Sequence, residues 1–259
     1  RSPTSVDPNM LQTRELTIRF GGLVAVNSVS CTFEPGTLTA IVGPNGAGKT
    51  TYFNLISGQI KASAGRVLLG GQDISALGAP ARAQAGLGRA FQLTNLFPQL
   101  TVQENVRLAV QARARAGLNL WRIWSDRRDL LEKTDRVLEA VALADKRDAV
   151  AASLPHGDQR KLEVGILMAL EPQVFMFDEP TAGMSVDEVP VILNLIRNLK
   201  NDKTKTILLV EHKMDVVREL ADRIIVLHNG TLVADGEPNE VIASPIVQEA
   251  YLGKAKEAA

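Results

Sequence analysis

Residues 43–50 read Gly43-Pro-Asn-Gly-Ala-Gly-Lys-Thr50, and this stretch decides the fold of the chain. It fits the phosphate-binding pattern G-x-x-x-x-G-K-[ST] at every fixed position. The glycines let consecutive backbone N–H groups curl around an anion, which larger side chains would crowd. Residues 37–42 read as a strand that enters the loop, and residues 51–57 as a helix that leaves it and ends at Gly58. The sequence therefore predicts a nucleoside triphosphate site in a strand–loop–helix unit.

Composition and charge narrow the class of protein. The 259 residues carry 29 Lys and Arg against 29 Asp and Glu, so no basic excess points to nucleic acid. The single cysteine, Cys31, excludes an internal disulfide and fits a reducing compartment. No apolar run approaches the roughly 20 residues of a membrane span. The first residues have no apolar core of a signal peptide, so we expect a cytosolic protein.

The pattern along the chain predicts an α/β fold. Strands are expected at 16–20, 26–33, 66–69, 173–177 and 206–210, and a hairpin at 223–235 around Asn229-Gly230. Helical spacing dominates 102–143, 157–170 and about 186–200, where Ser185 and Glu188 form a capping box. We expect a phosphate-loop core with a β-rich antiparallel subdomain and an inserted helical subdomain at about 93–170. The whole domain would span 11–253, with tails at 1–10 and 254–259.

Two adjacent carboxylates, Asp178 and Glu179, follow the continuous apolar run at 173–177. Strand ends feed the ligand crevice of an open α/β sheet. Asp178 is placed there to hold Mg²⁺ and Glu179 to polarise a water for attack on the γ-phosphate. Alone, the pair could equally be surface carboxylates at a strand end, but the phosphate loop favours the catalytic interpretation.

Together these motifs resemble the ATPase subunit of ABC transporters, from Leu11 to Gly253. The resemblance makes 43–50 the Walker A loop and 174–178 Walker B, with Glu179 as catalytic carboxylate. It makes Gln92 the Q-loop glutamine, His212 the switch histidine and Phe20 the residue that stacks on adenine. The implied ATP-binding set is Phe20, Gly43, Asn45, Gly46, Ala47, Gly48, Lys49, Thr50, Thr51 and Gln92. The implied Mg²⁺ set is Thr50, Gln92 and Asp178.

Residues 154–160 stand where this family has its signature sequence, which contacts the γ-phosphate held by the other subunit. The implied contact residues are Leu154, Pro155, His156, Gly157 and Asp158. His156 and Asp158 resemble the variant of the branched-chain amino-acid importers, as do the segments 20–26, 178–184, 211–214 and 249–253. Pro155 departs from the pattern because its ring replaces the serine hydroxyl and donates nothing. Ser185 departs too, where most members carry Asp.

The resemblance implies an ATP-driven subunit of a membrane importer, for branched-chain or other amino acids. ATP and Mg²⁺ are the implied cofactors. The implied partners are a second ABC ATPase, in a heterodimer or a homodimer, and transmembrane permeases that hold the pair at the inner face of the membrane. Residues 93–97, with Trp121 and Trp124, are candidates for the permease-docking surface. Internal packing would explain the two tryptophans equally well. A soluble cluster-assembly ATPase is the alternative, since it is also a single cytosolic domain.

Overall fold

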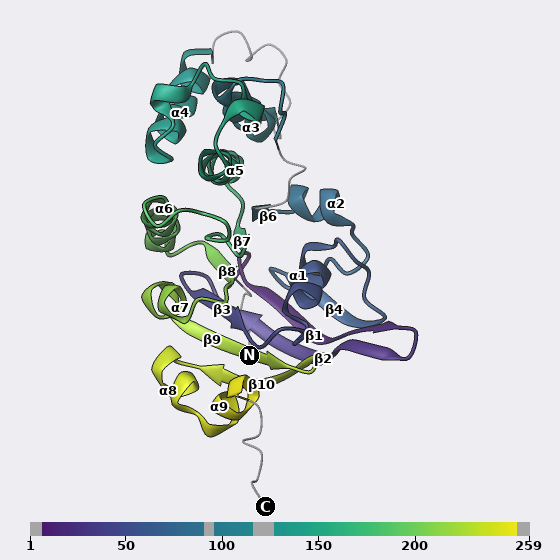
Figure 1. The fold of residues 1–259 in the computed structure, drawn as a ribbon. Helices are drawn as coiled ribbons and strands as arrows, with labels where there is room; N and C mark the ends of the chain where they lie inside the picture. Colours follow the sequence, from purple (N-terminus) through teal and green to yellow (C-terminus); the bar gives the residue numbers. More distant parts are fainter. Residues whose placement is uncertain (1–6, 91–95, 116–126, 253–259) are drawn as a thin grey trace, which may run out of the picture. The chain divides into compact units, whose positions relative to one another are not determined.

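The computed structural model describes residues 7–90, 96–115 and 127–252 (Figure 1). Its residues group into two compact units. The first comprises the described residues within 1–87, 173–179 and 200–259, and the second comprises those within 88–172 and 180–199. The limits expected from the sequence, 11–253 for the domain and about 93–170 for the insertion, stay predictions. No described helix is long and apolar enough to cross a membrane.

A largely parallel sheet carries the phosphate loop. Its strand order is β10-β9-β3-β8-β7-β6. The strands are β3 (Leu38–Val42), β6 (Leu87–Ala90), β7 (Val174–Asp178), β8 (Thr206–Val210), β9 (Arg223–His228) and β10 (Thr231–Gly236). β3 runs parallel to both β8 and β9, and β7 runs parallel to β8. All residues of β3 and β8 are buried, as expected of apolar strands covered on both faces.

An antiparallel sheet, ordered β2-β1-β4-β5, forms the second layer of the first unit. It comprises β1 (Leu11–Phe20), β2 (Leu23–Phe33), β4 (Ala64–Leu69) and β5 (Gln72–Asp73). Its inner face shares one core with α1 (Lys49–Ser57) and the parallel sheet. Tyr52, fully buried on α1, meets the Thr13 hydroxyl of β1 at 2.7 Å, which satisfies both polar groups. The β-rich subdomain predicted from the sequence is therefore present.

The described residues of the first unit form four further helices: α2 (Ala79–Gln84), α7 (Met214–Leu220), α8 (Pro238–Ala243) and α9 (Pro245–Leu252). Val217 of α7, Val241 of α8 and Val247 of α9 pack in one cluster with Val42 and Val226 of the sheet. α8 and α9 lie beside β10 at the C-terminal end (Figure 1). The sequence interpretation did not predict α2, α7, α8 or α9.

The second unit is helical. It contains α3 (Val102–Arg115), α4 (Arg127–Ala140), the short 3₁₀ turns η1 (Ala144–Lys146) and η2 (Ala151–Ser153), α5 (His156–Leu170) and most of α6 (Val189–Asn201). α3, α4 and α5 pack on one another. Their contacts bury apolar residues at helical spacing, including Val106, Val110, Leu138, Leu162 and Ile166.

The start of α6 differs from the prediction. The helix begins at Val189, and residues 186–188 form a turn. A helix capped at Ser185 would place Pro190 beyond the first turn, where the missing N–H would break a helical hydrogen bond. Starting at Val189 puts Pro190 at the second helical position, where no such bond is needed. The expected capping box is half formed: Glu188 Oε2 accepts from Ser185 N–H at 3.1 Å, but Glu188 N–H bonds the Ser185 carbonyl.

Candidate functional site

The phosphate loop joins β3 to α1 in a conformation that requires glycine. Gly48 has φ +96°, and a Cβ there would lie 2.6 Å from the Ala25 carbonyl oxygen. At Gly43 a Cβ would lie 2.2 Å from the Leu227 carbonyl oxygen. Backbone from β2 and from β9 therefore presses against the loop at two points. The loop pattern in the sequence reflects this close packing as well as phosphate binding.

Lys49 is almost fully buried, with 5% of its surface exposed. Its Nζ donates to the carbonyl oxygens of Gly43 at 2.7 Å and Pro44 at 2.9 Å, so the side chain folds back across its own loop. Burial lowers the pKa of Lys49, while the nearby carboxylates of Glu179 and then Asp178 oppose that shift. The structure thus brings the loop lysine and both predicted carboxylates together.

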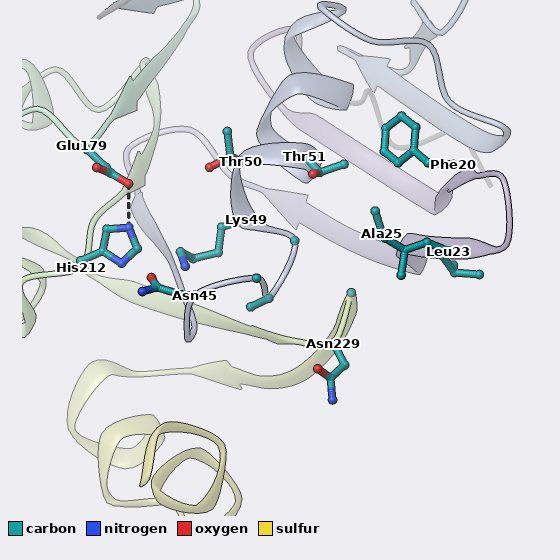
Figure 2. A pocket seen from close by; sticks show the side chains of 15 residues that line it. Phe20, Leu23, Ala25, Asn45, Lys49, Thr50, Thr51, Glu179, His212 and Asn229 are labelled. Atoms are coloured by element: carbon teal, nitrogen blue, oxygen red, sulfur yellow. Dashed lines mark hydrogen bonds and ion pairs between the residues drawn. The ribbon is translucent and has the colours of Figure 1, made fainter. Parts of the chain in front are cut away.

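Glu179 and His212 form a direct pair at the ends of neighbouring strands. The His212 Nε2 and Glu179 Oε1 atoms are 2.6 Å apart, and Figure 2 shows the contact opposite the loop. Glu179 has a left-handed backbone, φ +48°, and its N–H donates to the Val210 carbonyl at 2.8 Å. Such backbone strain persists only where the surroundings enforce it, and it often marks functional sites. The side chains stay 38% and 42% exposed, which leaves them accessible to a ligand.

A cavity of about 630 Å³ joins these groups. Its volume lies in the range of small-molecule and cofactor sites. It is lined by Phe20, Leu23, Val24, Ala25, Asn45, Gly46, Ala47, Gly48, Lys49, Thr50, Thr51, Glu179, His212, Asn229 and Gly230 (Figure 2). Phe20 is 53% exposed and Leu23 66%, so one end of the cavity offers apolar surface to a flat ring. The other end holds the phosphate loop and the Glu179–His212 pair.

The sequence interpretation missed the contribution of Leu23 to Ala25 and of the Asn229-Gly230 turn. Gly230 N–H donates to the Ala47 carbonyl at 3.0 Å, and Asn27 N–H donates to the Gly230 carbonyl at 2.8 Å. These bonds bring the hairpin turn against both the loop and β2. The Asn-Gly signal indicated the turn itself, but nothing local in the sequence indicated its neighbour.

The predicted signature residues lie in the second unit at the start of α5. Leu154 is buried, whereas Pro155 and His156 are exposed. Pro155 is the N-cap residue and provides no side-chain cap to the helix. The Asp158 side chain points into the unit, where it pairs with Lys146 and, at 2.9 Å, with Lys161.

Burial would raise the pKa of Asp158, but hydrogen bonds from Lys146 and Lys161 hold it below its ordinary value. The Asp158 carboxylate therefore serves an internal ion pair, and a contact from this residue to a ligand would come from its backbone. Gln92, residues 93–95, Trp121 and Trp124 lie outside the described residues.

Comparisons with known proteins identify the family. The family model described as "ABC transporter" matches residues 26–182, more than half of the chain. The chain is 39% identical over 251 residues to the high-affinity branched-chain amino acid transport ATP-binding protein LivG of Escherichia coli, covering 95% of this chain and 98% of the relative. It is 36% identical to the corresponding protein BraF of Pseudomonas aeruginosa, with the same coverage.

A solved structure agrees with the sequence relatives. The crystal structure of the ADP conformation of MJ1267, an ATP-binding cassette of an ABC transporter, superposes with a TM-score of 0.79 at 30% identity, covering 95% of this chain and 99% of that one. The chain belongs to the ABC transporter family, as an ATP-binding ATPase subunit.

Proposed function

We propose that this ABC ATPase binds ATP in the cavity of its first unit and powers the import of branched-chain amino acids. The observation that carries the proposal is the Glu179–His212 pair, 2.6 Å apart, beside the buried Lys49 of the phosphate loop. The names of LivG and BraF support the substrate class. The relatives reported above are all transporter subunits, so they give no support to a soluble cluster-assembly ATPase.

Each side chain has a distinct task in ATP hydrolysis. Phe20 offers its exposed ring to the adenine, and Lys49 exchanges its two loop carbonyls for the β- and γ-phosphates. The Glu179 carboxylate accepts the proton of the attacking water. His212 Nε2 holds that carboxylate in place and is positioned to contact the γ-phosphate.

The residues present also fit a magnesium ion. Thr50 lies in the first turn of α1, and the half-buried Asp178 is the last residue of β7. The Thr50 hydroxyl and the Asp178 carboxylate are the hard oxygen donors that Mg²⁺ prefers. Gln92 is the third proposed ligand from the sequence. A bound ion would neutralise phosphate charge during phosphoryl transfer.

In this proposal the second half of each ATP site comes from a partner. Two ATPase subunits enclose ATP head to tail, and residues 154–158 of one face the phosphates held by the other. Permease subunits hold the pair at the inner face of the membrane.

Because Pro155 has no hydroxyl and gives α5 no side-chain cap, the signature that this chain presents is weakened. A heterodimer with one strong and one weak site follows. Pro155→Ser should raise the ATPase rate of the complex, and an unchanged rate would contradict this asymmetry.

Reconstituted transport tests the proposed function. The complex is purified in detergent through a tag on this chain and reconstituted in liposomes that enclose MgATP or MgADP, and uptake of radiolabelled leucine from the outside solution is measured. We expect a polytopic membrane protein in the complex and uptake with MgATP alone. A complex without membrane subunits, or one without leucine uptake, would contradict the proposal.

A further inference from the structure

The start of α5 is covered by a carboxylate from the turn before α6, within the second unit. A Cβ built on Gly157 would lie 1.9 Å from Glu188 Oε1, 2.1 Å from its Cδ and 2.4 Å from its Oε2. The Glu188 carboxyl group thus lies directly against Gly157, in space that even a methyl group would fill. The neighbouring segments meet as well, since a Cβ on Gly183 would lie 3.3 Å from the His156 ring.

Glu188 is held in this position by the turn that precedes α6. Its Oε2 accepts from the Ser185 backbone N–H at 3.1 Å and from the Ser185 hydroxyl at 3.0 Å. Its own N–H donates to the Ser185 carbonyl at 3.1 Å. With Oε2 bonded to Ser185, Oε1 is the atom nearest to the Cβ position of Gly157.

The electrostatics of the α5 N-terminus favour an anion at this place. The first backbone N–H groups of a helix have no partner within the helix, and they carry a partial positive charge. The N-cap residue Pro155 contributes no side-chain acceptor to them. The Asp158 carboxylate, in the same turn, is occupied by Lys146 and Lys161. Glu188 therefore brings the negative charge that lies over Gly157.

We propose that Glu188 is a further residue of the ATP site that this chain completes for its partner, where its carboxylate occupies the phosphate-facing side of the signature. This inference rests on the proposed function, in which Gly157 faces the partner's ATP. A triphosphate that approaches Gly157 meets a like charge at close range, so Glu188 must be displaced or must weaken the contact. Glu188 thereby lowers the affinity of the closed pair of ATPase subunits for ATP.

The test compares two neutral variants of neighbouring carboxylates. Glu188→Gln removes the charge but keeps an oxygen that accepts from Ser185, so the turn is retained. Asp187→Asn removes the same charge one residue earlier, on an exposed side chain. Each variant is purified as the complex through the tag on this chain, and the MgATP concentration for half-maximal ATPase rate is measured at low and high salt. MgATP binding to each isolated chain is measured by calorimetry.

The expected result is a gain in the apparent MgATP affinity of the complex, which a purely structural role of Glu188 would not produce. Glu188→Gln should lower the half-saturating MgATP concentration about two- to fivefold, the size expected for a partly exposed charge pair. The gain should shrink at high salt because salt screens repulsion. MgATP binding to the isolated chain and the melting temperature should not change.

Two outcomes would overturn the inference. If Glu188→Gln has the same half-saturating MgATP concentration as Asp187→Asn, or a higher one than wild type, Glu188 does not repel the phosphates bound by the partner. If the wild-type complex does not hydrolyse ATP, the proposed function fails and the inference with it. The wild-type rate alone distinguishes these two failures.

Discussion

Arg82 supports the helix that carries the phosphate loop, although it lies far from that loop in sequence. Arg82 belongs to α2, and 3% of the residue is exposed. One nitrogen, Nη1, donates to the carbonyls of Leu55 at 2.7 Å and Ile56 at 2.6 Å, in the last turn of α1. Nε donates to the Leu77 carbonyl at 2.9 Å, and Nη2 to the Ser75 carbonyl at 3.1 Å. Arg82→Met removes all four hydrogen bonds while filling most of the volume.

The cost of Arg82→Met follows from the acceptors left behind. A buried acceptor without a partner costs about 1–3 kcal/mol, and the bonds to Leu55 and Ile56 are both buried. Part of this is recovered because the burial of the guanidinium, which lowers the pKa of Arg82, is itself unfavourable. We expect a net loss of about 2–4 kcal/mol of unfolding free energy. For a chain of this size that loss lowers the melting temperature by roughly 4–16 °C.

Differential scanning calorimetry measures the effect against a matched control. Arg66→Met removes an arginine of the same unit whose side chain is 68% exposed and lies 3.8 Å from Asp73. An exposed ion pair of this kind contributes under about 1 kcal/mol, so the control should melt within roughly 4 °C of wild type. Equal melting temperatures for the two variants would refute the reasoning that Arg82 anchors the end of α1.

The remaining predictions concern the site and the signature turn. Gly48→Ala forces a Cβ to 2.6 Å from a backbone oxygen at φ +96°, so MgATP binding measured by calorimetry should weaken about tenfold or more. The control Gly78→Ala, with no atom within 4 Å of its Cβ, should bind MgATP as wild type does. Equal MgATP affinities for the two variants would contradict the packing argument. His212→Ala should lower kcat about 10²-fold with little change in MgATP affinity, because the Glu179 carboxylate loses the contact that positions it. A normal kcat would exclude the Glu179–His212 pair from catalysis. Because the folded-state pKa of Asp158 is depressed, its ion pairs stabilise the protein above the unfolded pKa near 3.8 and lose that effect as pH falls through the folded value. Asp158→Asn should therefore flatten the acid limb of the melting-temperature profile, and an unchanged limb would contradict the pairing.

Local sequence patterns were sufficient for the elements around the loop. The apolar runs predicted β3, β7 and β8 to within a residue or two, because strands buried on both faces leave a continuous signal. Gly58 ends α1 with φ +78°, as its position after the helical segment indicates. The Asn229-Gly230 hairpin also formed as expected, with both residues at positive φ.

What the sequence did not predict depends on contacts between distant segments. The cavity position of Asn229 follows from hydrogen bonds that its neighbour Gly230 makes to the loop and β2. The Glu188 carboxyl group, held by Ser185, meets Gly157 only because the fold brings the turn before α6 to the start of α5. Neither contact leaves a periodic or compositional trace. The cap signal at Ser185 predicts the wrong start for α6, because the missing N–H of Pro190 favours a helix that begins at Val189.

The central claim is that Glu179, held by His212, is the base that activates water for ATP hydrolysis. Glu179→Gln keeps the size of the side chain but removes its ability to accept a proton. In the complex purified through this chain, we predict unchanged binding of MgATP and a turnover number reduced by about 10²-fold or more. Hydrolysis at a near-normal rate by the Glu179→Gln complex would contradict the claim.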